Sequence, residues 1–84
     1  MYNDQHNSCL IVFSSSTSLH KAEKVLKNAG ISVEETRPPS GLTGGSCAYA
    51  LALQERNTAS ARRLLGEIPH GGIYCRMNGG YREV

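Results

Sequence analysis

The residue of this chain best suited to chemistry is a cysteine in the stretch GLTGGSCAYALAL, residues 41–53. Gly44, Gly45 and Ser46 lie directly before Cys47. Glycines remove side chains that would shield the sulfur, and they let backbone amides approach it. Such surroundings favour the thiolate, which is the nucleophilic form of cysteine. The pattern favours a reactive thiol at Cys47, while the alternative of a small, buried packing residue stays open.

The elements that must position this cysteine follow one another in the order βαββαβ. Apolar and alternating runs predict strands, and apolar residues at helical spacing predict helices. The strands are expected over 9–13, 31–36, 46–54 and 73–77, and the helices over 19–29 and 56–68. This order predicts an α+β fold: a ferredoxin-like two-layer sandwich of an antiparallel sheet with both helices on one face.

The same topology predicts which segments meet near Cys47. The start of the first helix with Ser16, the Pro/Gly loop 37–45 that begins at Arg37, and His70 before the last strand all fall at one end of the sheet. A helix N-terminus offers free N–H groups and a partial positive charge, and it can hold an anion. We therefore expect Cys47 to be the catalytic residue. The expected binding residues are Gly44, Gly45, Ser46, Ser16, Arg37 and His70.

The remaining cysteines and histidines suggest no further site. Cys9 and Cys75 are predicted to be core residues of the first and last strands. The chain has no CxxC pair, so neither a zinc ribbon nor a dithiol motif is indicated. His6 and His20 have no ligand partners at a suggestive spacing, so no metal is expected. The cysteine usage is typical of a reduced cytoplasmic protein.

Length and charge limit the possible classes. The 84 residues suffice for one domain, with residues 1–8 as a flexible N-terminus and residues 78–84 as a turn and short extension. The net charge of +2 is too balanced to indicate a nucleic acid or an anionic membrane as partner. We expect no signal peptide, and the longest apolar run, residues 9–13, is far too short to span a membrane.

Two stretches of the chain carry a family pattern. The stretch LIVFSSSTSLHKAEKVLKNAGI holds a strand, a Ser-containing turn and a helix with AEK-L---G spacing. The stretch RPPSGLTGGSCAYALAL holds a Pro-rich turn, one cysteine and an apolar strand. In both, over residues 9–77, the chain resembles the selenium/sulfur-carrier-like proteins, small bacterial domains linked in some cases to selenium metabolism. It departs from them at Ala48, where they have glycine, and at Ser40, where they have arginine.

The resemblance implies that Cys47 accepts and passes on sulfur or selenium, as a persulfide or its selenium analogue. The thiolate would attack the terminal sulfur of a donor persulfide, as in thiol–disulfide exchange. Such a carrier needs a donor and an acceptor protein and no cofactor, and it is a carrier rather than a turnover enzyme.

The fold class also allows a function without a reactive thiol. A non-catalytic interaction or regulatory module would act through a homodimer, paired by the sheet face away from the helices. Ala48, Ala50 and Ala52 are expected to make that face flat.

Overall fold

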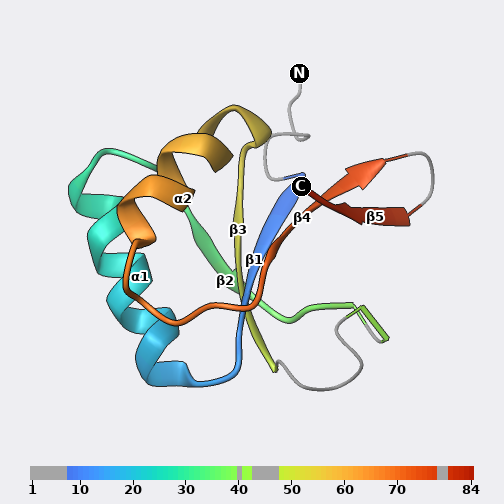
Figure 1. Cartoon of the computed structure of the whole chain (residues 1–84), viewed down its shortest axis with the longest axis horizontal. Coiled ribbons are helices and arrows are strands. Elements are labelled where there is room, and N and C mark those ends of the chain that lie inside the picture. Colours follow the sequence, from blue (N-terminus) through green and yellow to red (C-terminus); the bar gives the residue numbers. More distant parts are fainter. Residues whose placement is uncertain (1–7, 40, 43–47, 78–79) are drawn as a thin grey trace.

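The computed structural model describes residues 8–39, 41–42, 48–77 and 80–84. Within these residues, five strands and two α-helices form two layers, whose arrangement Figure 1 shows. The strands are β1 (Cys9–Phe13), β2 (Glu34–Thr36), β3 (Tyr49–Leu53), β4 (Ile73–Met77) and β5 (Gly80–Glu83). The helices are α1 (Ser16–Asn28) and α2 (Thr58–Leu65), and the short 3₁₀ helix η2 (Glu55–Asn57) precedes α2. Residues 1–7 of the predicted flexible N-terminus, and the predicted turn at 78–79, lie outside the described residues.

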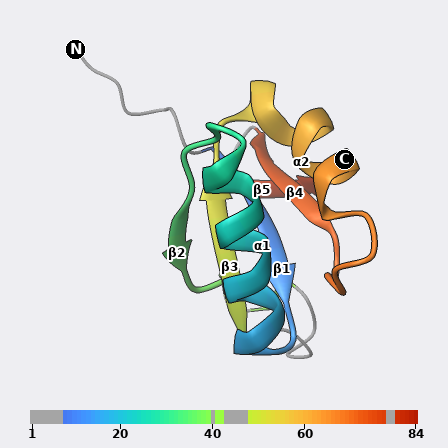
Figure 2. The ribbon, with the colours of Figure 1, turned by 90° about the vertical axis from the view of Figure 1, so that its left-hand side faces the viewer.

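The strands form one sheet in the order β2-β3-β1-β4-β5, and every neighbouring pair is antiparallel. Both helices cover the same face of this sheet (Figure 2). The predicted α+β class, antiparallel sheet and two helices are confirmed. The sheet has a fifth strand because residues 80–83 pair back on β4, with Tyr81 opposite Arg76. The ferredoxin-like assignment is therefore confirmed in class and layers, whereas its exact strand arrangement is not.

The main core lies between the sheet and the helices. Alternate strand residues point into it, because successive side chains of a strand face opposite sides. Phe13 of β1, Leu51 of β3 and Ile73 of β4 are at most 1% exposed there. Leu19, Ala22 and Leu26 of α1 and Ala61 and Leu65 of α2 complete this layer. Ile31 and Val33 are also buried in it, although β2 itself is shorter than predicted and begins at Glu34.

A second, smaller cluster lies on the opposite face of the sheet. Leu10, Val12, Ala50 and Ala52 form it, and the half-buried Leu42, Tyr74 and Tyr81 pack against it. Ala50 is fully buried and Ala52 is 7% exposed within the single chain. The alanine face that the interaction-module alternative requires is therefore already largely covered, and only Ala48 of the three is exposed.

Helix α1 begins at Ser16, three residues before the predicted start, and ends at Asn28, one residue before the predicted end. Its N-cap is Ser15, whose side-chain oxygen accepts a hydrogen bond of 3.1 Å from the backbone N–H of Ser18. After its last turn the chain turns at Gly30, which has a φ of 84°, in the left-handed region that favours glycine. Neither helix of the described segments has the length and apolar character needed to cross a membrane.

Candidate functional site

The catalytic residue that the sequence predicts, Cys47, lies outside the described residues, as do the predicted binding residues Gly44, Gly45 and Ser46. Their roles stay predictions. The structure does describe the segments on both sides of them, and it describes Ser16, Arg37 and His70. These described residues define the surroundings of the predicted site.

Three segments meet at the end of the sheet where β1 ends. Tyr49, the first residue of β3, lies opposite Phe13, the last residue of β1. The backbone N–H of Val12 donates to the carbonyl oxygen of Gly72 over 3.1 Å, and the N–H of Gly71 donates to the carbonyl oxygen of Val12 over 2.7 Å. The segment that leads into β4 thus lies beside the end of β1. Because Tyr49 is two residues beyond Cys47, the chain reaches β3 from this same end.

Helix α1 starts at this end as well. Ser16 is its first residue, is exposed, and lies three residues after Phe13. The first turn contains no acidic residue that would offset the partial positive charge of the helix N-terminus. Ser15 and Ser18 satisfy part of the hydrogen bonding there: the hydroxyl of Ser15 donates to that of Ser18 over 3.2 Å. This serine-rich start is a well-formed cap, and it contributes a weak positive potential to this end of the sheet.

Arg37 lines an open hollow beside the start of β3. Glu35, Thr36, Arg37, Ala48 and Tyr49 enclose a volume of about 570 Å³. β2 and β3 bring these residues together because Thr36 lies opposite Ala50 in the sheet. Ala48 directly follows Cys47 in the sequence, so the hollow begins one residue from the predicted thiol. It combines one guanidinium, one carboxylate and one phenol, a polar lining that suits a charged group of a partner.

His70 lies in the segment between α2 and β4 and is half-buried. Its Nδ1 is 2.8 Å from the carbonyl oxygen of Ile68. A carbonyl oxygen only accepts, so Nδ1 carries a proton, and the neutral ring then has its lone pair on Nε2. The backbone N–H of the next residue, Gly71, forms the hydrogen bond to Val12 of β1 that was described above. His70 is therefore held at the same end of the sheet as Ser16 and the start of β3.

The sequence prediction for Cys9 and Cys75 was right about burial and wrong about chemical state. Both residues are at most 1% exposed, and a disulfide joins them. They lie directly opposite each other in β1 and β4, with a Cα–Cα distance of 4.0 Å. The backbone N–H of Arg76 donates to the carbonyl oxygen of Ser8, so the ladder hydrogen bonds here come from the residues next to the two cysteines. Cys9 and Cys75 therefore form a non-hydrogen-bonded pair, the kind of cross-strand pair whose side chains approach most closely. The expectation of fully reduced cysteines is therefore corrected.

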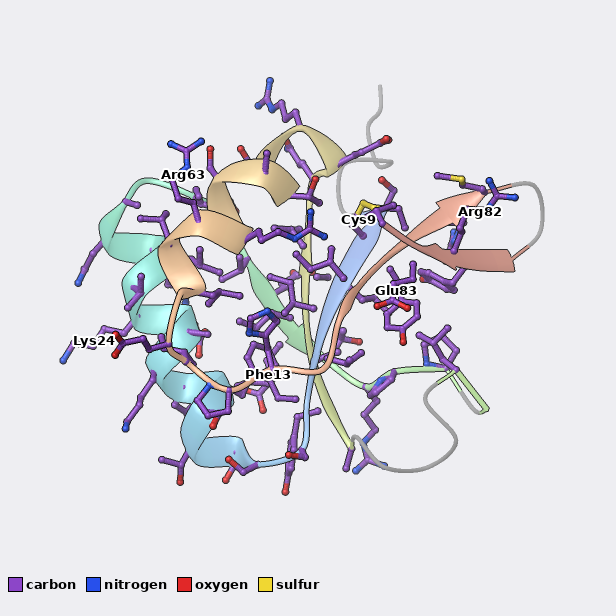
Figure 3. All side chains as sticks on the ribbon, in the orientation of Figure 1. Cys9, Phe13, Lys24, Arg63, Arg82 and Glu83 are labelled. Atoms are coloured by element: carbon purple, nitrogen blue, oxygen red, sulfur yellow. A yellow bond between two sulfur atoms is a disulfide. The ribbon has the colours of Figure 1, made fainter. Side chains whose placement is uncertain are left out.

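The disulfide lies far from the predicted site. Cys9 begins β1 and Phe13 ends it, and Figure 3 shows their side chains at opposite ends of the strand. At about 3.3 Å per residue the two positions are about 13 Å apart. Since Cys9 and Cys75 pair with each other, Cys47 is the one cysteine of the three that this disulfide leaves.

Comparison with known proteins gives one match. The family described as "Putative Se/S carrier protein-like" matches residues 8–75, most of the chain, and this span includes Cys47. No curated protein and no solved structure matches. The matched span contains β1 to β3, both helices and the start of β4. The chain belongs to the "Putative Se/S carrier protein-like" family.

Proposed function

We propose that this protein carries sulfur or selenium between two partner proteins on the thiol of Cys47. The family match over residues 8–75 is the observation that carries this proposal. The described residues next to Cys47 in the sequence support it. Ala48, the residue after Cys47, lines the hollow with Arg37, and the starts of α1 and β3 lie with His70 at the same end of the sheet. Positive charge and helix N-termini favour the thiolate over the thiol.

The transfer is a thiol exchange in two steps. The Cys47 thiolate attacks the terminal sulfur of a donor persulfide, forms a new S–S bond, and breaks the S–S bond of the donor. The donor leaves as a thiolate and takes up one proton, which balances the proton that Cys47 lost on ionising. A thiolate of the acceptor then attacks the terminal sulfur on Cys47 in the same way. The sulfur atom moves without net oxidation or reduction, and selenium follows the same path.

The Cys9–Cys75 disulfide supports a carrier that delivers only to another protein. A cysteine persulfide can be lost if a neighbouring thiol of the same chain attacks it and closes a disulfide. Cys9 and Cys75 are bonded to each other, buried, and at the far end of β1. No second thiol of this chain is then free to release the cargo, so the acceptor must supply it.

We further propose that the carrier acts in the cytoplasm, in spite of its disulfide. Cytoplasmic thiols keep most disulfides reduced. Exchange requires a thiolate to reach a sulfur atom, and both sulfur-bearing residues here are at most 1% exposed. Reduction then needs a local opening between β4 and β1, which is the central and fully buried strand of the sheet.

The rate of Cys47 alkylation as a function of pH tests the proposal. In the native protein the disulfide blocks alkylation of Cys9 and Cys75, so labelling reports on Cys47 alone, and Cys47→Ser is the blank. We expect a midpoint well below the value of about 8.5 for a free cysteine, with fast modification. Slow modification with an ordinary or raised midpoint would make Cys47 a packing residue and favour the interaction-module alternative.

A further inference from the structure

A group of potential metal ligands lies where α1 faces the edge strand β2. It consists of His20 and Glu23 of α1 and Glu35 of β2. One ligand atom from each of the three lies within 4.8 Å of the others. His20 Nε2 and Glu35 Oε1 are 4.0 Å apart. Among the described residues no other group of this kind brings three such side chains together.

The fold, rather than chance contact of flexible side chains, brings this group together. His20 and Glu23 are three residues apart in α1, so they share one face of the helix. Glu35 lies opposite Leu51 in the sheet, and Leu51 belongs to the helix-side core. Glu35 therefore faces the helix layer, because residues opposite each other in a sheet point to the same side. In Figure 2 the edge strand β2 runs alongside α1.

We propose that His20, Glu23 and Glu35 form a binding site for a divalent transition-metal ion, with Zn²⁺ as the best match. One imidazole nitrogen and two carboxylates are a set of donors that zinc accepts, and carboxylates alone would instead suit Mg²⁺ or Ca²⁺. Donor atoms that share a zinc ion at about 2.0–2.2 Å lie roughly 3.3–3.6 Å apart. The ligand atoms lie within 4.8 Å of one another, with His20 and Glu35 at 4.0 Å, and small side-chain rotations bring them to this distance.

The exposure of two of the three ligands allows such a closure. The side chains of His20 and Glu35 are 62% and 53% exposed, so their rotation displaces no packed neighbour. Glu23 is less free: it is 22% exposed and forms an ion pair of 2.9 Å with Lys27. The metal must compete with this ammonium group for the Glu23 carboxylate. Three protein ligands leave a fourth position for water or for a group of a partner.

A metal at this site would connect the edge strand β2 to helix α1, beside the hollow that Arg37 lines. Glu35 belongs to both, since it is a metal ligand in this proposal and also lines the hollow with Arg37. A metal bound by Glu35 therefore holds a carboxylate that also lines the hollow with Arg37. The metal site requires nothing of Cys47 and holds whether or not the carrier function does.

The test is zinc binding by isothermal titration calorimetry with Zn²⁺ alone as the probe. The protein is the full chain with Cys47→Ser, which removes the free thiol as a competing zinc ligand. We expect one zinc per chain, with affinity at least about tenfold weaker for His20→Ala and for Glu35→Gln. Both residues are exposed and alanine favours helix, so these variants keep the fold. Lys27→Gln should tighten binding, because it releases the Glu23 carboxylate.

Matched controls locate the site. His70→Ala and His6→Ala remove the other two histidines of the chain and should leave zinc affinity unchanged. Excess Mg²⁺ should not displace Zn²⁺, because an imidazole nitrogen is a poor ligand for Mg²⁺ and a good one for Zn²⁺. Absence of zinc binding, or binding that is unchanged in His20→Ala, would overturn the proposal. Weakening by His70→Ala or His6→Ala in place of His20→Ala would overturn it as well.

Discussion

Cys9 and Cys75 face each other across β1 and β4 and are joined by a disulfide, with both residues at most 1% exposed. This bond links the strand that opens the fold to the last strand of the main core layer. It separates the three cysteines into a buried pair and Cys47. The buried pair can stabilise the domain, and Cys47 is the thiol that the proposed exchange with partners requires.

Loss of the disulfide should weaken the fold. The bond closes a loop between residues 66 positions apart. In the chain-entropy account, opening such a loop lowers the free energy of unfolding by about 4 kcal/mol. We expect Cys9→Ala/Cys75→Ala to show this drop in urea denaturation. The natural chain, reduced while unfolded and kept in reductant, should show a similar drop. Equal urea midpoints for oxidised and reduced chains would remove the structural role assigned to the bond.

Arg37 should tune the reactivity of Cys47. It lines the hollow that begins one residue from the thiol, so its charge favours the thiolate. We expect Arg37→Gln to slow Cys47 alkylation near pH 7 by about threefold and to move its midpoint to higher pH. Added salt should narrow the difference, because exposed charges are screened.

Arg56→Gln is the matched control for Arg37. Arg56 is exposed and lies in η2, beyond the other end of β3. Its removal changes the net charge by the same amount and should leave the alkylation rate of Cys47 unchanged. If Arg37→Gln and Arg56→Gln slow the alkylation equally, the effect comes from the net charge of the protein. The position of Arg37 beside the hollow would then contribute nothing to the reactivity of Cys47.

Gly30 should be a position where backbone conformation alone determines stability. Its φ is 84°, and a Cβ there would meet no atom within 4 Å. Gly30→Ala should therefore cost about 1 kcal/mol through strain in the left-handed region, with no steric clash. Gly80→Ala also meets open space, and its φ lies outside that region, so its thermal midpoint should stay close to that of the natural chain. Similar losses for both would refute the backbone explanation.

The local elements could be predicted from the sequence because their signals are local. The apolar run 9–13 corresponds to β1 with the same bounds, and the predicted strand 46–54 corresponds to β3 over Tyr49–Leu53. Gly30 ends the pattern of α1 as expected. In the predicted strand 31–36, Ile31 and Val33 are buried as the alternation suggests, but only residues 34–36 pair with β3. The alternation of apolar and polar residues predicts which side chains are buried. It does not predict which backbone N–H and C=O groups form hydrogen bonds with a neighbouring strand.

The contacts between distant segments could not be predicted in the same way. No tight turn links β1 to β4, so nothing in the sequence sets the register that places Cys9 opposite Cys75. The partner of His20 was missed for a similar reason: Glu35 is 15 residues away, on β2. The His20–Glu23 spacing within α1 was the one local signal available. The predicted meeting of Ser16, His70 and the start of β3 at one end of the sheet followed from topology, which needs no register.

The most direct test of the account is loading of Cys47 with sulfur. The native chain is treated with a low-molecular-weight persulfide, desalted, and its intact mass is measured beside that of Cys47→Ser. We predict a gain of one sulfur atom on the natural chain, removed by a thiol acceptor, and no gain on the variant. A natural chain that gains no sulfur, or a Cys47→Ser chain that gains as much, would contradict the assignment of Cys47 as the carrier.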